Sequence, residues 1–434
     1  MTTFLASVGD NAFILLAFIV AMSVIVFIHE FGHYIVGRWS GIYADTFSVG
    51  FGPVVIARTD KRGTQWQIAL YPFGGYVKFA GDANAASVGA TQEAGRHTMQ
   101  GAPLWARAAT VAAGPIFNFI FAILIFAGYL LWTGKPAETL TFESGYDVPA
   151  AYQSDLQPGD RITAIAGIPL EQDDIYSVLP DQPRFDYTVI RDGQEITVEG
   201  PAPVIPRVVG LAPRSAADDA RLRIGDVITA IDGEPTSKFG DLVTAVAAAE
   251  GTPLTLTVWR DGTELTRELS ARRVDLPLPE GGFETRWMIG ITGDTFFKAA
   301  RVSVGPWEAL SSGSEQLWWR ITTSLSGLWN IINGSISSCN LSGPVGIAQA
   351  SGSMAAQGTG SFILFIGVLS AAVGLLNLFP IPILDGGHLV FHAYEAIARR
   401  KPSENALKYL MIGGLSLIGM LMTFAILNDL IFCP

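Results

Sequence analysis

The sequence predicts a multi-pass α-helical membrane protein with four transmembrane helices and two inserted α/β domains. Three observations support this fold class. Only 15% of the 434 residues are charged, whereas a soluble chain carries about 25%. Four apolar segments are each close to the roughly 20 residues that a bilayer-spanning helix needs. The long stretch between the second and third of these segments contains a tandem repeat.

Composition also excludes several function classes. The deficit of charged residues, beside 49% hydrophobic residues, excludes a disordered protein, a nucleic-acid-binding tail and an ordinary cytosolic enzyme. The net charge of -11 argues against a nucleic-acid partner, because binding to phosphates needs an excess of cations. The two cysteines are too few for a disulfide framework and are not spaced as metal ligands.

The four expected transmembrane helices cover residues 13–37, 106–132, 362–384 and 409–432. The first lies where a secretory signal peptide would also lie. It lacks a basic n-region and a small-residue cleavage site, and its apolar run ends in a His-Glu pair. We therefore expect a retained transmembrane helix.

Lysine and arginine residues near the ends of the spans set the expected orientation. Residues 1–12 contain none. The loops after the first and third spans are basic, with Arg38, Arg58, Lys61, Arg62, Lys78, Arg96 and Arg107 in one and Arg399, Arg400, Lys401 and Lys408 in the other. Basic loops stay in the cytoplasm, so both termini and the long 133–361 region are expected outside.

The 133–361 region contains an internal repeat. Residues 156–169 (LQPGDRITAIAGIP) resemble residues 222–235 (LRIGDVITAIDGEP), and residues 187–197 resemble residues 256–266. Offsets of 66 and 69 residues fit two tandem domains, the second about three residues longer. Each copy has a Gly-Asp pair, an alternating strand, a helix-like stretch and an Asp-Gly hairpin. The pattern resembles the circularly permuted PDZ domains of bacterial proteases.

In the second copy, Gly210 and Leu211 occupy the place where such domains bind a peptide carboxylate. One interpretation is capture of an extended peptide or a chain terminus by strand addition. The other is a passive spacer or size filter over the membrane part. The first copy has no clear equivalent of these residues, so its groove is expected to be degenerate.

The first span contains the sequence His29-Glu30-Phe31-Gly32-His33. Residues four apart share one helix face, so both imidazoles can face one metal ion. Zinc accepts such ligands in a tetrahedral arrangement, and catalytic sites leave one position open for water. Glu30 can then act as the general base toward that water. Histidines that only hydrogen-bond a helix neighbour are the weaker interpretation, because unpaired ionisable groups are costly inside a membrane.

The third-ligand patterns of two classes of soluble zinc protease do not fit the chain. A metzincin would need glycine at position 36 and histidine at position 39, where the sequence has Val36 and Trp39. A gluzincin would use a downstream glutamate, and none lies between Glu30 and Glu93. The third ligand is therefore expected elsewhere.

Polar groups at membrane depth gather at the end of the third span, in residues 377–388. Two prolines break the helix there, and non-helical backbone at membrane depth is tolerated where it lines a cavity. The expected topology puts Asp385 on the same side as the two histidines. Asp385 is therefore the predicted third ligand and His388 the weaker candidate, while His97 and His392 are expected to play no part.

Together these motifs resemble the site-2 protease family of intramembrane zinc proteases, which has HExxH in one span and Asn-x-x-Pro-x-Pro-x-Leu-Asp-Gly in another. The tandem PDZ-like insertion makes the chain similar to the regulator-of-sigma-E protease subgroup. The resemblance covers nearly the whole chain. It implies zinc on His29, His33 and Asp385, with Glu30 as the base, and hydrolysis of peptide bonds within membrane-spanning helices.

The resemblance also implies partners and a location. The substrates would be single-span membrane proteins similar to anti-sigma factors already shortened by an upstream site-1-type protease, or signal-peptide remnants. The setting would be the lipid bilayer of a bacterial inner membrane during a stress response. Two other classes remain open. A catalytically inactive membrane scaffold is disfavoured by the intact Glu30, and a transporter by the lack of inverted repeats among the spans.

Three further residues are implied by the resemblance. Asn118, at the end of Gly114-Pro115-Ile116-Phe117-Asn118 in the second span, would lie near the active site. Its alternative role is an interhelical hydrogen bond. Asn377 and Pro382 resemble positions that contact substrate or shape its path, and alternatively they only end the helix.

The segment after the first span is expected to form a β-hairpin, from strands at 46–53 and 66–71 and a turn at 60–63. The family places a membrane re-entrant hairpin here, whose edge could pair with an unwound substrate. A cytoplasmic hairpin that only braces the helices is the alternative. The stretch 82–100 is expected to be a flexible loop.

Residues 301–350 predict amphipathic helices on the outer membrane face, because tryptophan favours that interface. The tryptophans are Trp307, Trp318, Trp319 and Trp329. Cys339 and Cys433 are expected on the oxidising side, where a disulfide and two free thiols are both open.

These expectations divide the chain into nine segments. They are 1–38 (first span with HExxH), 39–105 (re-entrant hairpin and loop), 106–133 (second span), 134–205 and 206–275 (the two PDZ-like domains), 276–361 (periplasmic-side amphipathic segment), 362–385 (third span with Leu-Asp-Gly), 386–408 (cytoplasmic loop) and 409–432 (fourth span).

Overall fold

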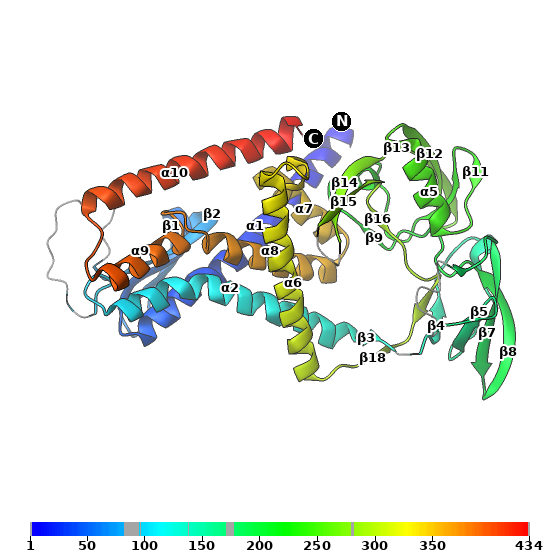
Figure 1. The fold of residues 1–434 in the computed structure, drawn as a ribbon, viewed down its shortest axis with the longest axis horizontal. Helices are drawn as coiled ribbons and strands as arrows, with labels where there is room; N and C mark the ends of the chain where they lie inside the picture. The colour runs from blue at the N-terminus through cyan, green and yellow to red at the C-terminus, as the bar shows by residue number, and fades with distance from the viewer. Residues whose placement is uncertain are drawn as a thin grey trace. The chain divides into compact units, whose positions relative to one another are not determined.

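The computed structural model describes residues 2–81, 95, 97–137, 139–170, 178–278 and 282–432. It consists of two compact units, drawn together in Figure 1. The membrane unit comprises Met1–Tyr129, Trp307–Leu328 and Leu341–Pro434. The repeat unit comprises Leu130–Pro306 and Trp329–Asn340. Most of the predicted loop at 82–100, and Cys433, lie outside the described residues.

Four helices in the described part of the chain are long and apolar enough to cross a membrane, as predicted. They are α1 (Thr2–Trp39), α2 (Leu104–Thr133), α8 (Thr359–Asn377) and α10 (Glu404–Leu427). Glycines let the helices approach closely. A Cβ atom on Gly32 of α1 would lie 2.5 Å from the carbonyl oxygen of Ala113 in α2, and one on Gly352 would lie 2.4 Å from the side chain of Ile14.

The third spanning helix is shorter than predicted. We expected it to reach residue 385, but α8 ends at Asn377. The two prolines predicted to break the helix follow in the loop at 378–384, and a new helix, α9 (Asp385–Ala398), begins at the Asp of the Leu-Asp-Gly motif. Most of the segment expected to be a cytoplasmic loop is therefore helical.

Two further helices are α6 (Pro306–Ile332), most of which belongs to the membrane unit, and α7 (Pro344–Ala356). Helix α6 crosses α2 (Figure 1), and Gly313 makes the crossing close, since its Cβ would lie 2.8 Å from the Ile123 carbonyl oxygen. Three of the predicted tryptophans are strongly exposed on α6: Trp307 (82%), Trp318 (68%) and Trp329 (64%). A tryptophan-rich helix thus occupies the place where the sequence predicts amphipathic helices.

The predicted hairpin consists of β1 (Ala44–Thr59) and β2 (Gln65–Phe79), which are longer than expected. The pairing is shifted around Gly50-Pro53, so that the two strands fold back on themselves. Residues 44–49 pair with residues 75–79 and also with residues 65–68. Apolar side chains near the middle of both strands are exposed, among them Val55 and Ile56 at 60% and 64%.

The repeat unit contains two four-stranded sheets of the same topology, one for each predicted domain. The first has the order β6-β5-β7-β8, and the second has the order β11-β10-β12-β13. The strands are β5 (Arg161–Ile165), β6 (Ile168–Pro169), β7 (Arg184–Arg191), β8 (Gln194–Pro201), β10 (Val227–Ile231), β11 (Glu234–Pro235), β12 (Pro253–Arg260) and β13 (Thr263–Ser270). Helices α4 (Ala216–Asp219) and α5 (Phe239–Ala249) lie in the second domain. The helix-like stretch of the first copy overlaps residues 171–177, outside the described residues.

The Gly-Asp pair of each repeat has a structural role. The Asp160 carboxylate accepts two hydrogen bonds from Arg191, at 2.7 and 2.6 Å, and one from the backbone N–H of Gln157. Asp226 and Arg260 form the same pair in the second domain, at 2.6 and 2.7 Å. The motif therefore ties the start of each sheet to the end of its third strand in sequence.

The described residues of 276–302 (276–278 and 282–302) differ from the expected amphipathic segment, because they contribute strands that complete the two domains. These strands are β14 (Arg272–Pro277), β15 (Phe283–Met288), β16 (Ile291–Thr292), β17 (Phe297–Ala299) and β18 (Arg301–Val302). They pair with one another or with β9 (Gly210–Leu211), β4 (Phe142–Gly145) and β3 (Lys135–Pro136). Phe296 and Phe297 are buried in the core of the first domain. Residues after 275 therefore return across the predicted boundaries at 205 and 275 to pair with strands of both domains.

Candidate metal centre

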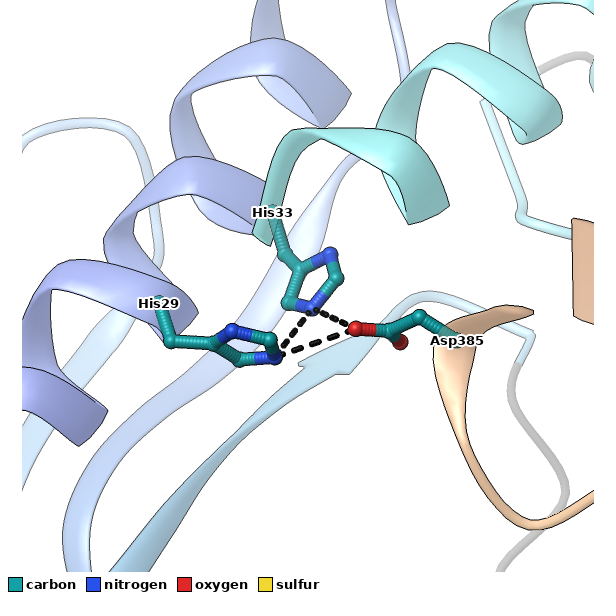
Figure 2. Close-up of side chains that lie close together, drawn as sticks. All are labelled: His29, His33 and Asp385. Atoms are coloured by element: carbon teal, nitrogen blue, oxygen red, sulfur yellow. Dashed lines mark hydrogen bonds and ion pairs between the residues drawn. The ribbon is translucent and has the colours of Figure 1, made fainter. Parts of the chain in front are cut away.

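His29, His33 and Asp385 converge on one point, as Figure 2 shows. His29 Nε2 lies 3.1 Å from His33 Nε2 and 3.1 Å from Asp385 Oδ2, and His33 Nε2 lies 3.4 Å from the same oxygen. The two imidazoles come from successive turns of α1, and the carboxylate comes from the first residue of α9. The three predicted ligands are therefore brought together across more than 350 residues of sequence.

These distances fit a zinc ion. A tetrahedral site with metal–ligand bonds of about 2.0–2.1 Å has ligand atoms about 3.3–3.4 Å apart. The three observed separations lie close to that edge length, and all three atoms are of the types that zinc prefers. Three protein ligands leave the fourth corner of the tetrahedron for a water molecule, as in catalytic zinc sites.

The hydrogen bond that His33 makes through Nδ1 also suits a metal ligand. Its Nδ1–H donates to the Thr110 carbonyl oxygen at 2.8 Å. Because a carbonyl oxygen can only accept, Nδ1 carries the hydrogen of the neutral ring and Nε2 offers its lone pair to the cluster. Helix α2 thus orients one of the two imidazoles through its backbone.

Gly114 lets α2 pass directly against the histidine pair. A Cβ atom at this position would lie 2.3 Å from His33 Nε2 and 2.8 Å from His29 Cε1, so any larger residue would displace the rings. The two glycines after Asp385 have a similar role. A Cβ on Gly386 would lie 2.3 Å from the Leu378 carbonyl oxygen, and one on Gly387 would lie 2.3 Å from that of Ile381. The loop after α8 therefore folds tightly over the start of α9.

Glu30 lines a cavity of about 730 Å³ together with the three predicted ligands. Tyr76 and Val77 of β2 form part of its wall. The strand reaches α1 beside Glu30 because Gly75 has no side chain, and a Cβ there would lie 3.4 Å from Glu30 Cγ and 3.0 Å from Val26. The predicted base, the ligand cluster and one segment of the hairpin thus share one cavity.

The structure places the other predicted site residues as follows. Asn118 is fully buried and contacts the ring of His29, with Nδ2 3.2 Å from Nδ1. Asn377 lines the cavity and donates from Nδ2 to the Val373 carbonyl oxygen at 3.0 Å. Pro382 packs instead against Gly414 of α10, whose Cβ would lie 3.1 Å from the proline ring.

The remaining histidines are separated from the ligand cluster. His388 lines the cavity and belongs to no ligand cluster found in the described residues. His392, which we expected to play no part, also lines the cavity. Burial, assisted by the Arg107 cation, lowers the pKa of His392 to about 4, so the ring is neutral at pH 7. His97 stacks on Tyr43 at 4.6 Å, as expected for a residue outside the site.

The contacts of Gly114 and of the Thr110 carbonyl oxygen with the histidines were not predicted from the sequence. The signal for Gly114 was present, since a glycine four residues before Asn118 allows close approach on the same helix face. A backbone carbonyl has no sequence signal at all.

The predicted peptide-binding residues Gly210 and Leu211 form β9, which pairs with Thr292 and Ile291 of the chain itself. Around them, the Val209 and Ala212 N–H groups donate to backbone carbonyl oxygens of this returning segment. One edge of β9 is therefore already paired, and peptide binding here stays a prediction.

Comparisons with known proteins show which family the chain belongs to. The model of peptidase family M50 matches residues 17–421. A relative from Agrobacterium fabrum that is named as a zinc metalloprotease is 36% identical over 438 residues, covering 99% of both chains. The regulator of sigma E protease of Salmonella typhimurium LT2 is 34% identical over 447 residues, covering 96% of this chain and 98% of its own. The regulator of sigma-E protease RseP of Escherichia coli K12 is 32% identical over 454 residues, with 96% and 98% covered.

Among solved structures, the PDZ domain of an SdrC-like protein from Listeria monocytogenes aligns with 21% of this chain and 86% of its own, at 21% identity and a TM-score of 0.17.

This helical membrane protein lines one cavity with two histidines, a glutamate and an aspartate, and the family match and the relatives identify it as a zinc-dependent metalloprotease. The chain belongs to peptidase family M50, the site-2 protease family, and its relatives include regulator of sigma-E proteases. The predicted family, enzyme class and cofactor are thereby confirmed.

Proposed function

We propose that this metalloprotease hydrolyses peptide bonds within the transmembrane segments of single-span membrane proteins. His29, His33 and Asp385 would hold the zinc ion, and Glu30 would be the general base. The observation that carries the proposal is the convergence of these ligands, within 3.4 Å of one another, from a spanning helix and from the loop that follows another. Their position requires the substrate to enter the membrane unit.

When bound, zinc would lower the pKa of a coordinated water and polarise the scissile carbonyl. Glu30 lines the same cavity and would take the proton from the attacking water, then pass it to the leaving amine. The α1 backbone fixes Glu30 next to His29, so the base and the ligand keep one geometry.

The substrate must be extended before it can be cut, because a helix buries its scissile bond among backbone hydrogen bonds. Residues 75–79 of β2 run beside Glu30 and form part of the cavity wall, so a substrate could add to them as a strand. Asn377, which also lines the cavity, is placed to contact such a strand. Pro382 would shape the path indirectly, through the loop it stiffens.

The expected substrates are anti-sigma-factor-like proteins already cut outside the membrane by an upstream protease, and signal-peptide remnants. The two repeat domains would then exclude uncut substrates by size or recognise their new ends, through Gly210 and Leu211 if peptide is bound. The charge distribution of the loops supports a bacterial inner-membrane orientation with both termini and the repeat unit outside and the metal centre toward the cytoplasm.

The test uses full-length protein in lipid nanodiscs with a fluorescent single-span substrate. Wild type should cut within the span and lose activity when a zinc chelator is added. Glu30→Gln should reduce the rate by at least about 10²-fold, since it removes the general base. Glu404→Gln, at the exposed start of α10, is the matched control and should cut normally.

A soluble peptide with the same scissile sequence separates this proposal from a general peptidase. It should be cut far more slowly than the membrane-embedded substrate. Equal rates on both would contradict the proposed substrate class, and unchanged activity of Glu30→Gln would contradict the proposed base.

A further inference from the structure

Helix α2 contacts the Nδ1 atom of each imidazole of the metal centre, the ring nitrogen that is not directed at the ligand cluster. His33 Nδ1 lies 2.8 Å from the Thr110 carbonyl oxygen, and His29 Nδ1 lies 3.2 Å from the side-chain amide of Asn118. Asn118 has no exposed surface. It is therefore shielded from a substrate in the cavity, and any influence on the reaction must pass through His29.

When the side-chain amide of Asn118 points Nδ2 toward His29, only one end of the amide has a hydrogen-bond partner among the described residues. Its oxygen, Oδ1, is then buried without a hydrogen-bond partner among the described residues. A half-turn of the amide exchanges the positions of Nδ2 and Oδ1, and the hydrogen-bond network decides between the two orientations. A buried acceptor without a donor is destabilising, which favours the other orientation if His29 can donate.

His29 must donate if its Nε2 is a zinc ligand. Nε2 faces His33 and Asp385 at 3.1 Å, so Nδ1 is the remaining nitrogen of the ring. In a neutral, metal-binding imidazole that nitrogen carries the hydrogen. With Nδ2 toward it, two donors would face each other. With Oδ1 toward it, His29 Nδ1–H donates to the amide oxygen, and the orphaned acceptor gains its partner.

We infer that Asn118 is a positioning residue for the metal centre: its Oδ1 accepts a hydrogen bond from His29 Nδ1–H and fixes the tautomer that presents Nε2 to zinc. This inference rests on the zinc ligands of the proposed function. The Thr110 carbonyl does the same for His33, so α2 supplies one acceptor to each histidine. Removing such a partner of a ligating histidine typically costs 10–100-fold in metal affinity.

The experiment compares Asn118→Asp with Asn118→Leu in the detergent-solubilised full-length protein. Aspartate has the same shape and only accepts, whereas leucine has a similar volume and no polar atom. Zinc affinity is measured by competition with a chromogenic chelator, and the site geometry by the visible absorption of the cobalt-substituted protein. Asn118→Leu should weaken zinc binding by about 10–100-fold and shift the cobalt spectrum. Asn118→Asp should bind zinc as tightly as wild type or more tightly.

Ser370→Ala is the matched control. Ser370 Oγ donates to the backbone carbonyl of Asn118 at 3.0 Å, so this variant removes a buried hydrogen bond at the same residue but leaves the amide intact. Its zinc affinity should stay within about twofold of wild type. Thermal unfolding of each metal-free variant reports whether the helices still pack.

Each outcome decides the inference. If Asn118→Asp binds zinc about 10-fold or more weakly than wild type, Asn118 is a donor and the inference is wrong. This comparison with wild type holds even where the leucine variant does not fold. Unchanged zinc affinity in Asn118→Leu would also overturn the inference, because Asn118 would then have a packing role only. If wild-type zinc binding does not depend on His33, tested with His33→Ala, the proposed zinc site itself fails. Dependence on His33 with no effect at Asn118 overturns only the present inference.

Discussion

Arg107 and Glu395 form a bidentate ion pair between the start of α2 and the last turn of α9. Nη1 and Nη2 of the arginine donate to Oε2 and Oε1 at 3.0 and 2.6 Å, and both side chains are largely buried, with 12% and 17% exposed. Helix α9 carries Asp385 at its first residue. The pair therefore fixes the helix that presents the carboxylate relative to the helix that lies against the histidines.

Breaking this ion pair should weaken zinc binding, although neither residue is a predicted zinc ligand. We expect Glu395→Gln to cost about 1.5–3 kcal/mol of stability, the usual range for hydrogen bonds to charged groups. Zinc affinity should fall several-fold, because Asp385 would be held less firmly. Arg107→Lys should behave similarly, since an ammonium cannot replace the paired geometry. Thermal unfolding and chelator competition measure the two effects. Arg400→Ala, an exposed arginine just after α9, is the control, and an equal effect there would contradict the prediction.

The repeat unit should lose stability in acid through Asp160. Hydrogen bonds from Arg191 hold the pKa of this buried carboxyl below its usual value of 3.8. Because the folded-state pKa is depressed, the carboxylate stabilises the fold fully above about pH 4–5 and loses that contribution as the pH falls through the folded pKa. Hydrogen exchange of the β7 and β8 amides in the full-length protein, corrected for intrinsic rates, should show faster opening below pH 4.

Asp160→Asn should speed that opening at pH 7 and flatten its dependence on pH, because the titrating group is gone. Asp192→Asn changes the exposed carboxylate next to Arg191 and is the control for charge alone. A pH profile of Asp160→Asn that matches wild type would show that other carboxyls govern the acid response.

The C-terminal end of α10 should depend on Asp429. This residue is 5% exposed, and its carboxylate accepts hydrogen bonds from the N–H groups of Gly343 and Gly346, at 3.1 and 2.9 Å, at the start of α7. Asp429→Ala leaves these two N–H donors unpaired, which should lower the free energy of unfolding by about 1–3 kcal/mol. The measurement is the thermal unfolding midpoint in detergent, which should fall. Thr423→Ala, exposed on α10, should have little effect. Equal midpoints for both variants would contradict this role.

The parts of the site that the sequence predicted are those with a local signal. His29 and His33 share a helix face because of a fixed periodicity, and Asp385 follows prolines that cannot continue a helix. The parts that it could not predict depend on distant contacts. Arg107 and Glu395 are 288 residues apart and have no local pattern in common.

The same reasoning applies to the repeat domains. Their strand–turn–strand patterns were visible, because alternation and Asp-Gly turns are local. The return of Phe297–Ala299 to pair with β4 was not, since strands of two or three residues carry too few positions to show alternation. The register of such a pair is set by the core it covers, which only the folded chain brings together.

Gly114 offers the sharpest test of how α2 supports the metal centre. Inside an exposed helix, replacing glycine by alanine normally stabilises by roughly 0.5–1 kcal/mol. At Gly114 the added Cβ would lie 2.3 Å from His33 Nε2 and 2.8 Å from His29 Cε1, so the rings would have to move or α2 would have to retreat. We expect Gly114→Ala to abolish high-affinity zinc binding and proteolysis. Gly128→Ala, on the same helix with open space around its Cβ, should leave both intact, and full zinc binding by Gly114→Ala would mean that α2 does not press on the histidines.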